Sequence, residues 1–167
     1  MLSTHALLRR ALRQLGSLAS FALLALAQLA TGLPRTAAAA ADGNSGSQVA
    51  NLATQYVGAK YAWGGASPAG FDCTGFVMWV YSQFGVSLPH TEAGQLAAGQ
   101  PVSADDLQPG DVVVFANTYR PGLSHAGIYL GNGRFIHAVD ESHGVLVSNM
   151  WDSYWGPRFF AASRELA

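Results

Sequence analysis

Apolar residues recur at helical spacing in two segments of the chain. The first covers residues 49–57 and ends near Gly58. The second begins at Cys73 and ends near Gly85, which is placed as a left-handed cap. Thr91 can cap a short third helix that runs to about residue 98. The apolar positions are Val49, Leu52, Ala53, Tyr56 and Val57 in the first segment and Phe76, Val77, Val80, Tyr81 and Phe84 in the second.

The pattern changes to an alternation of period two in the second half of the chain, where β-branched and aromatic residues are frequent. Gly131, Asn132 and Gly133 tolerate positive φ and predict a tight hairpin between the second and third of the expected strands. Helices followed by strands predict an α+β domain, in which N-terminal helices pack on an antiparallel sheet of about five strands. The strands are expected at about residues 111–116, 124–130, 134–139, 145–148 and 158–162.

The pattern of basic, apolar and small residues over positions 1–41 predicts a secretory signal peptide. A basic head precedes an apolar stretch at residues 15–30, and small residues at 37–41 permit cleavage near 39–41. The apolar stretch is shorter than the ~20 residues that span a membrane, so we expect no stable membrane anchor and a secreted or periplasmic protein. An uncleaved anchor and an Ala-rich helix are the alternatives. The basic residues of the head are Arg9, Arg10 and Arg13.

The rest of the chain predicts a short lead and one domain. Residues 42–48 are rich in Gly, Ser and Asn and predict a flexible lead, and residues 49–167 predict a single folded domain. After residue 41 the chain has five basic and ten acidic residues, a net charge of −5. Scattered cations on an acidic domain exclude nucleic-acid binding, which needs a basic face.

A single cysteine, Cys73, excludes an intramolecular disulfide, a four-cysteine zinc site and a two-cysteine redox motif. It lies in the first turn of a predicted helix, after a Gly-rich loop. The positive end of the helix dipole favours the thiolate there, which indicates a nucleophile, although the neighbouring Asp72 opposes this effect. An inert buried cysteine is the alternative interpretation.

Two histidines, His125 and His137, fall in the predicted strands on either side of the glycine-rich turn. Both occupy odd positions and aliphatic residues occupy even ones, so we expect both histidines on the face opposite the aliphatic one. Paired residue numbers must then have an even sum, as a three-residue loop at 131–133 gives. A two-residue turn would separate the histidines unless a bulge intervened. The even positions are Ala126, Ile128, Leu130, Ile136 and Ala138.

Cys73, His125 and His137 suit two kinds of site. A cysteine with a histidine within reach is a nucleophile with its general base, and such a pair needs no cofactor and no metal. The same three side chains are also ligands that zinc prefers.

Five short motifs resemble the NlpC-type cell-wall cysteine peptidases, over about residues 49–162. The resemblance implies the papain-like α+β fold of that family for the domain at 49–167. It also implies that Cys73 is the nucleophile, that His125 is its general base and acid, and that His137 orients the imidazole. The motifs are YAWGG at 61–65, GFDCTGF at 70–76, LPHT at 88–91, PGD at 109–111 and SHAGIYLG at 124–131.

The resemblance assigns further roles around the nucleophile. It implies that the hydroxyl of Tyr61 helps to stabilise the oxyanion, and that substrate-binding residues include Asp72, Thr74 and Trp63. Thr74 stands where the family more often has serine, and His90 stands where many relatives have arginine. These departures affect substrate fit rather than the catalytic centre.

The implied function is that of an exported bacterial cysteine endopeptidase. It would hydrolyse stem-peptide amide bonds of peptidoglycan, usually between γ-D-glutamate and the diamino acid, through an acyl-enzyme on Cys73. An N-acetylmuramoyl-L-alanine amidase of the same clan and a catalytically silent wall-binding module are the alternatives. Peptidoglycan stem peptides are thus the expected partner, and the sequence carries no signal for an oligomeric state.

Overall fold

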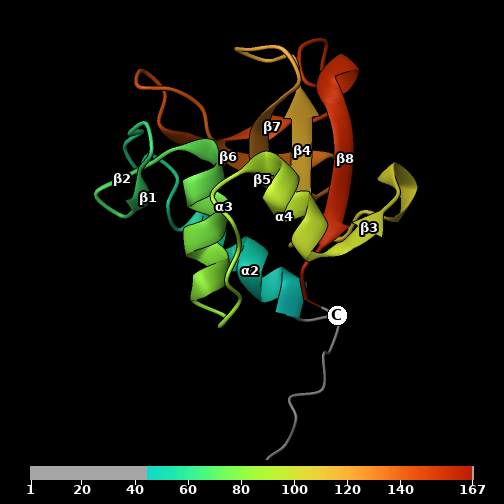
Figure 1. The fold of residues 1–167 in the computed structure, drawn as a ribbon, viewed down its shortest axis with the longest axis horizontal. Coiled ribbons are helices and arrows are strands. Elements are labelled where there is room, and N and C mark those ends of the chain that lie inside the picture. The colour runs from blue at the N-terminus through green and yellow to red at the C-terminus, as the bar shows by residue number, and fades with distance from the viewer. Residues whose placement is uncertain (1–44, 167) are drawn as a thin grey trace, which may run out of the picture. The chain divides into compact units, whose positions relative to one another are not determined.

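The computed structural model describes residues 45–166, in which three α-helices and a six-stranded antiparallel sheet form an α+β domain (Figure 1). The predicted signal peptide lies outside the described residues. Within residues 45–166 no helix is long and apolar enough to cross a membrane. The helices are α2 (Ser45–Thr54), α3 (Cys73–Ser82) and α4 (Glu92–Ala98), with short 3₁₀ helices at Ala104–Asp106 and Gly156–Arg158.

Helix α2 begins at Ser45, earlier than predicted. Residues 45–48 are therefore helical, and the prediction of a flexible lead over 42–48 is wrong for them. Gly46 packs against Pro109 in this first turn, because a Cβ at this position would collide with the Pro109 carbonyl oxygen. The glycine therefore permits close packing against the chain, a role that composition alone does not distinguish from flexibility.

The main sheet has the strand order β3-β8-β4-β5-β6-β7. All five predicted strands are present, but the sheet has six, so the expected count was too low. The strand that sequence reasoning missed, β3, contains Pro101 and lies at the sheet edge, where proline is tolerated. The strands are β3 (Gln100–Val102), β4 (Val112–Ala116), β5 (Leu123–Gly131), β6 (Arg134–Ala138), β7 (Val145–Asn149) and β8 (Phe159–Arg164), with a separate small hairpin of β1 (Ala66–Ser67) and β2 (Gly70–Phe71).

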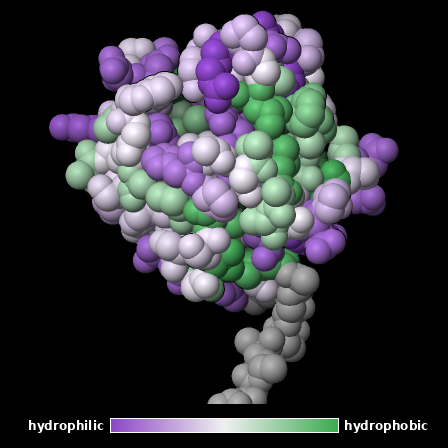
Figure 2. Space-filling model, in the orientation of Figure 1, coloured by the Kyte–Doolittle hydropathy of each residue, from purple (hydrophilic) through white to green (hydrophobic). Residues whose placement is uncertain are grey.

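The two faces of the sheet pack against different elements. The aliphatic face, which includes Ala126, Ile128 and Ile136, is covered by α2 and α3 (Figure 1). The opposite face carries a second core around Phe115, Phe135 and the loop residue Trp155, and both histidines lie on it. On the surface shown in Figure 2, apolar residues gather on the side of β4 and β8.

The hairpin between β5 and β6 uses a two-residue turn with a bulge. Gly131 pairs with Arg134, and a register shift at Leu130 restores the even-sum pairing of Ile128 with Ile136. Asn132 has a φ of 53°, which a tight turn with positive φ requires. The predicted common face of the histidines is confirmed, whereas the three-residue loop is replaced by the turn and bulge.

Candidate active site

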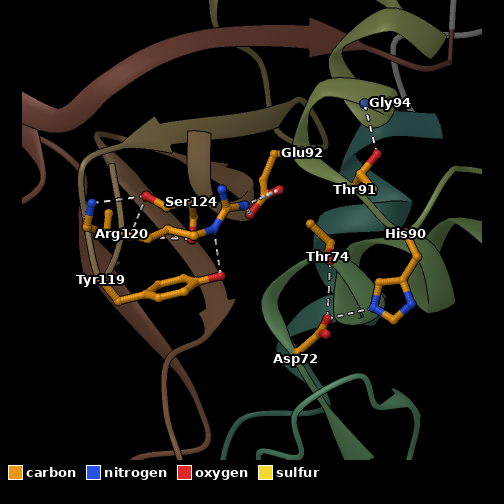
Figure 3. Close-up of polar contacts among 10 residues, drawn as sticks. Asp72, Thr74, His90, Thr91, Glu92, Gly94, Tyr119, Arg120 and Ser124 are labelled. Atoms are coloured by element: carbon orange, nitrogen blue, oxygen red, sulfur yellow. Dashed lines mark hydrogen bonds and ion pairs between the residues drawn. The ribbon is translucent and has the colours of Figure 1, made fainter. Parts of the chain in front are cut away.

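Cys73 is the first residue of α3, and the preceding Asp72 caps the helix. One carboxylate oxygen of Asp72, Oδ1, accepts hydrogen bonds from the Gly75 amide at 2.6 Å, His90 Nε2 at 2.8 Å and Thr74 Oγ1 at 3.3 Å. The other, Oδ2, accepts one from the Gly64 amide at 3.0 Å. Figure 3 shows the contacts with His90 and Thr74. Asp72 therefore holds the helix start and the Gly-rich loop together.

The thiol of Cys73 is 7% exposed. Burial raises its pKa to about 12, with smaller contributions in the same direction from Asp72 and Glu92. The backbone amides of Ala126 and Thr74 act in the opposite direction. Desolvation therefore acts against the thiolate, in the opposite direction to the effect expected from the helix dipole.

His125 and His137 form a hydrogen-bonded relay with a third polar residue. His125 Nε2 lies 2.7 Å from His137 Nδ1, and His137 Nε2 lies 2.9 Å from Ser148 Oγ. If His125 Nε2 donates to His137, then His125 Nδ1 is the nitrogen free to accept a proton, and His137 donates to Ser148. Both ring nitrogens of His137 are therefore engaged, which leaves neither free for a zinc ion.

Aromatic side chains enclose both imidazoles. Phe135 stacks on His137 with ring centroids 4.2 Å apart, and Trp155 lies 4.9 Å from the His125 ring and 4.8 Å from the His137 ring. Burial lowers the pKa of His125 to about 3 and lowers that of His137 well below 6.5. Both histidines are therefore neutral at pH 7, as a general base must be before the reaction.

The thiol lies against strand β5 beside His125. The Ala126 amide, next to His125, is close enough to hydrogen-bond to the sulfur. Cys73 thus lies against the residue that follows the proposed base.

Gly127, which has no side chain, leaves room for the histidine relay. A Cβ on Gly127 would lie 3.1 Å from the Cβ of His137 and 2.7 Å from the Ile136 carbonyl oxygen. Gly127 therefore allows β6 to approach β5 closely at the point where His137 must reach His125.

Tyr61 is held beside the nucleophile by backbone pairing. It forms a parallel bridge with Phe71, two residues before Cys73, and the Ala62 amide donates to the Phe71 carbonyl at 2.9 Å. Burial raises the pKa of Tyr61 to about 12, with a smaller contribution from Cys73. Its hydroxyl therefore keeps its proton at pH 7 and can act as a hydrogen-bond donor.

Two depressions meet at the rings of Tyr61, Trp63 and Tyr119, which line both. We call them the Cys73-side pocket and the His125-side pocket. Trp63 is 73% exposed, and its ring meets that of Tyr119 edge to face at 5.9 Å. The Cys73-side pocket is otherwise lined by polar groups that include Asp72, Thr74, His90, Glu92 and Arg120. The His125-side pocket is otherwise lined by His125, Thr118, Val139, Asp140, Tyr154 and Trp155.

An ion pair that the sequence did not predict crosses the Cys73-side pocket. Arg120, in the loop between β4 and β5, donates from Nη2 to both carboxylate oxygens of Glu92 at 3.2 Å and from Nε to the Tyr119 hydroxyl at 3.3 Å (Figure 3). Sequence reasoning also missed Ser148 and Asp140. No local pattern marks these residues, because long-range folding brings them to the cleft.

The buried thiol at a helix start, the histidine relay and the α+β scaffold have the features of the papain-like cysteine peptidases. A model of the NlpC/P60 family matches residues 58–164, more than half of the chain. The chain belongs to the NlpC/P60 family, which confirms the family resemblance found in the sequence.

Curated relatives and solved structures agree with this placement. The chain is 46% identical over 118 residues to a probable endopeptidase of Mycobacterium tuberculosis, a match that covers 70% of this chain and 29% of the relative. It is 46% identical over 109 residues to gamma-DL-glutamyl hydrolase of Bacillus subtilis, covering 64% of this chain and 26% of that protein. The crystal structure of the NlpC/p60 domain of the peptidoglycan hydrolase SagA superposes with a TM-score of 0.62 and 32% identity, over 71% of this chain and 97% of that domain. These two curated relatives are thus matched over less than a third of their length.

Proposed function

We propose that this protein is an exported cysteine endopeptidase that hydrolyses the bond between γ-D-glutamate and the diamino acid in peptidoglycan stem peptides. The buried Cys73 thiol beside the relay of His125, His137 and Ser148 carries the proposal. Relatives named endopeptidase and gamma-DL-glutamyl hydrolase support the kind of bond, and the likeness to the SagA domain supports the polymer. The basic and apolar pattern of residues 1–41 supports export.

Acylation begins from a neutral thiol and a neutral imidazole. His125 Nδ1 accepts the thiol proton as the Cys73 sulfur attacks the substrate carbonyl, and His137 stabilises the imidazolium through its contact with Nε2. The Cys73 amide and the Tyr61 hydroxyl donate hydrogen bonds to the oxyanion. When the C–N bond breaks, His125 returns the proton to the leaving amine and the acyl group stays on sulfur as a thioester.

Deacylation uses the same groups with water as the nucleophile. His125 accepts a proton from water as its oxygen attacks the thioester, and the C–S bond then breaks. The products are a carboxylic acid and the regenerated thiol, so atoms and protons balance without a cofactor. His137, which holds the His125 ring, in turn contacts the neutral Ser148 hydroxyl, and among residues 45–166 no carboxylate contact is recorded for either histidine of the relay.

Mass spectrometry of muropeptide digests tests this function. We expect the purified protein to release peptides that end in γ-D-glutamate and fragments that begin with the diamino acid. Release of intact stem peptides from muramic acid would instead identify the amidase. The Cys73→Ala variant is the matched control, and cleavage by it at the rate of the parent protein would contradict the mechanism.

A further inference from the structure

The His125-side pocket combines aromatic walls with one carboxylate. Tyr61, Trp63, Tyr119 and Tyr154 contribute rings, and Asp140 is the only acidic residue among the described residues that line it. Aromatic faces attract cations, and a carboxylate provides the opposite charge. The lining therefore suits an aliphatic chain that ends in an ammonium group.

Only one of the two carboxylate oxygens of Asp140 is hydrogen-bonded within the described part of the protein. The Ser142 amide and hydroxyl and the His143 amide and ring Nδ1 all contact one oxygen, Oδ1, at 2.7–3.0 Å. Among residues 45–166, no hydrogen bond or ion pair is recorded for Oδ2, and the side chain is 51% exposed. One oxygen thus fixes the turn after β6, and the other remains available to a ligand.

The chemistry of the reaction assigns this pocket to the leaving group, and this step rests on the proposed function. Cys73 retains the acyl half of the substrate, whereas His125 gives its proton to the departing amine. The pocket that contains His125 therefore receives the diamino acid, whose α-amine leaves. The side chain of that residue carries a second amine.

We propose that Asp140 and the surrounding aromatic rings bind the side-chain ammonium of the diamino acid in the leaving group. Lysine reaches such a site on a flexible four-carbon stem, and diaminopimelate carries the same ammonium with an additional carboxylate. Asp140 is then a specificity-determining residue on the leaving-group side of the scissile bond.

The Cys73-side pocket offers no equivalent carboxylate. Glu92 is paired with Arg120 through both of its oxygens, and both oxygens of Asp72 accept hydrogen bonds from the protein. An incoming ammonium would have to displace these partners there. Among the described residues that line the two pockets, only Asp140 offers it a carboxylate oxygen with no recorded protein partner.

Cleavage of three synthetic tripeptides tests the proposal. They are L-Ala-γ-D-Glu-L-Lys, its norleucine analogue, which lacks the terminal ammonium, and its meso-diaminopimelate analogue. We expect the parent protein to favour lysine over norleucine by about tenfold in kcat/KM. In the Asp140→Asn variant, the ratio of kcat/KM for the lysine peptide to that for the norleucine peptide should approach one. Only lysine cleavage should become slower, because the amide oxygen of Asn can still accept the hydrogen bonds that hold the turn, so norleucine cleavage is unaffected. Glu141→Gln, a neighbouring charge outside the pocket, is the matched control and should keep the ratio.

The outcomes separate this inference from the proposed function. Equal cleavage of lysine and norleucine by the parent protein, or a parallel loss of both in Asp140→Asn, would overturn the inference and leave the endopeptidase in place. Cleavage of none of the peptides by the parent protein would overturn both. If Asp140→Asn slows cleavage of the lysine peptide alone, Asp140 recognises the lysine side chain. If it slows cleavage of both the lysine and the diaminopimelate peptides, Asp140 recognises the ammonium group that the two side chains share.

Discussion

The two halves of the cleft differ in how their charges are paired. In the Cys73-side pocket, Glu92 meets Arg120 and Asp72 meets His90, and protein groups bond both oxygens of each carboxylate. In the His125-side pocket the walls are aromatic, and Asp140 keeps one oxygen without a recorded protein partner among the described residues. Asp140 meets His143 through Oδ1 alone, so of the two halves only the His125 side offers a carboxylate oxygen with no recorded partner among the described residues.

Under the proposed function, this difference supplies a physical basis for the direction in which a stem peptide binds. A substrate with an ammonium on one side of its scissile bond gains most when that side occupies the His125-side pocket. In that orientation the acyl side lies over Cys73, where protein groups already bond both oxygens of Asp72 and of Glu92. Under the proposed function the asymmetry of the cleft thus selects which bond faces the thiol, and four sets of experiments can break or sharpen this account.

The largest effect is expected where the two halves meet. Cys73→Ala and His125→Ala should each lower kcat/KM by about 10⁴-fold, and the double variant should lose little more, because the two groups act as a unit. Steady-state kinetics measures the losses, and thermal unfolding checks that each variant is folded. Additive losses in the double variant would contradict a shared proton transfer.

The relay behind His125 should contribute less. His137→Ala should cost about 100-fold in activity and His137→Asn about tenfold, since an amide can still hold the His125 ring by a hydrogen bond. Ser148→Ala, one step further away, should cost less than tenfold. The same loss in all three variants would argue against an orienting role for His137.

The His125 side should also make the fold sensitive to acid. Burial lowers the pKa of both histidines below 6.5, so the unfolded chain binds more protons than the folded one between pH 6.5 and about 3. Above pH 6.5 these two groups should therefore leave the free energy of unfolding nearly constant. As the pH is lowered from 6.5, the free energy of unfolding should decrease, by about 1.4 kcal/mol per histidine at pH 5.5. Urea unfolding at pH 7.5 and 5.5 measures this loss. His137→Asn should reduce it.

The smallest effect concerns the paired charges on the Cys73 side. Glu92 raises the pKa of the thiol, so Glu92→Gln should lower that pKa, by up to about one unit. The pH dependence of alkylation by iodoacetamide reports the shift. Glu141→Gln removes a charge that does not act on Cys73 and should leave the profile unchanged; a higher thiol pKa in Glu92→Gln would contradict the assignment.

Local patterns in the sequence predicted most of the scaffold. Helical spacing located α3 with Cys73 at its start, and alternation placed His125 and His137 on one face of the sheet. Family motifs then indicated the roles of these residues. Such predictions succeed because periodicity and turn residues act over a few positions along the chain.

The features that were missed depend on distant segments. Strand β3 forms only against β8, about sixty residues later, and Glu92 meets Arg120 across 28 positions. Ser148 joins the relay through the register of β6 and β7, which the intervening turn determines. The raised pKa of the Cys73 thiol also escaped prediction, because it arises from burial by the whole fold, which the local sequence does not reveal.

A quenched-flow experiment followed by mass spectrometry tests the central claim most directly. The purified protein is mixed with L-Ala-γ-D-Glu-L-Lys, quenched in acid and digested, and the peptide that contains Cys73 is weighed. The account predicts a transient adduct on Cys73 with the mass of the L-Ala-γ-D-glutamyl group, which hydroxylamine removes. Product formation with no adduct on Cys73 at any time, together with full activity in Cys73→Ala, would contradict it.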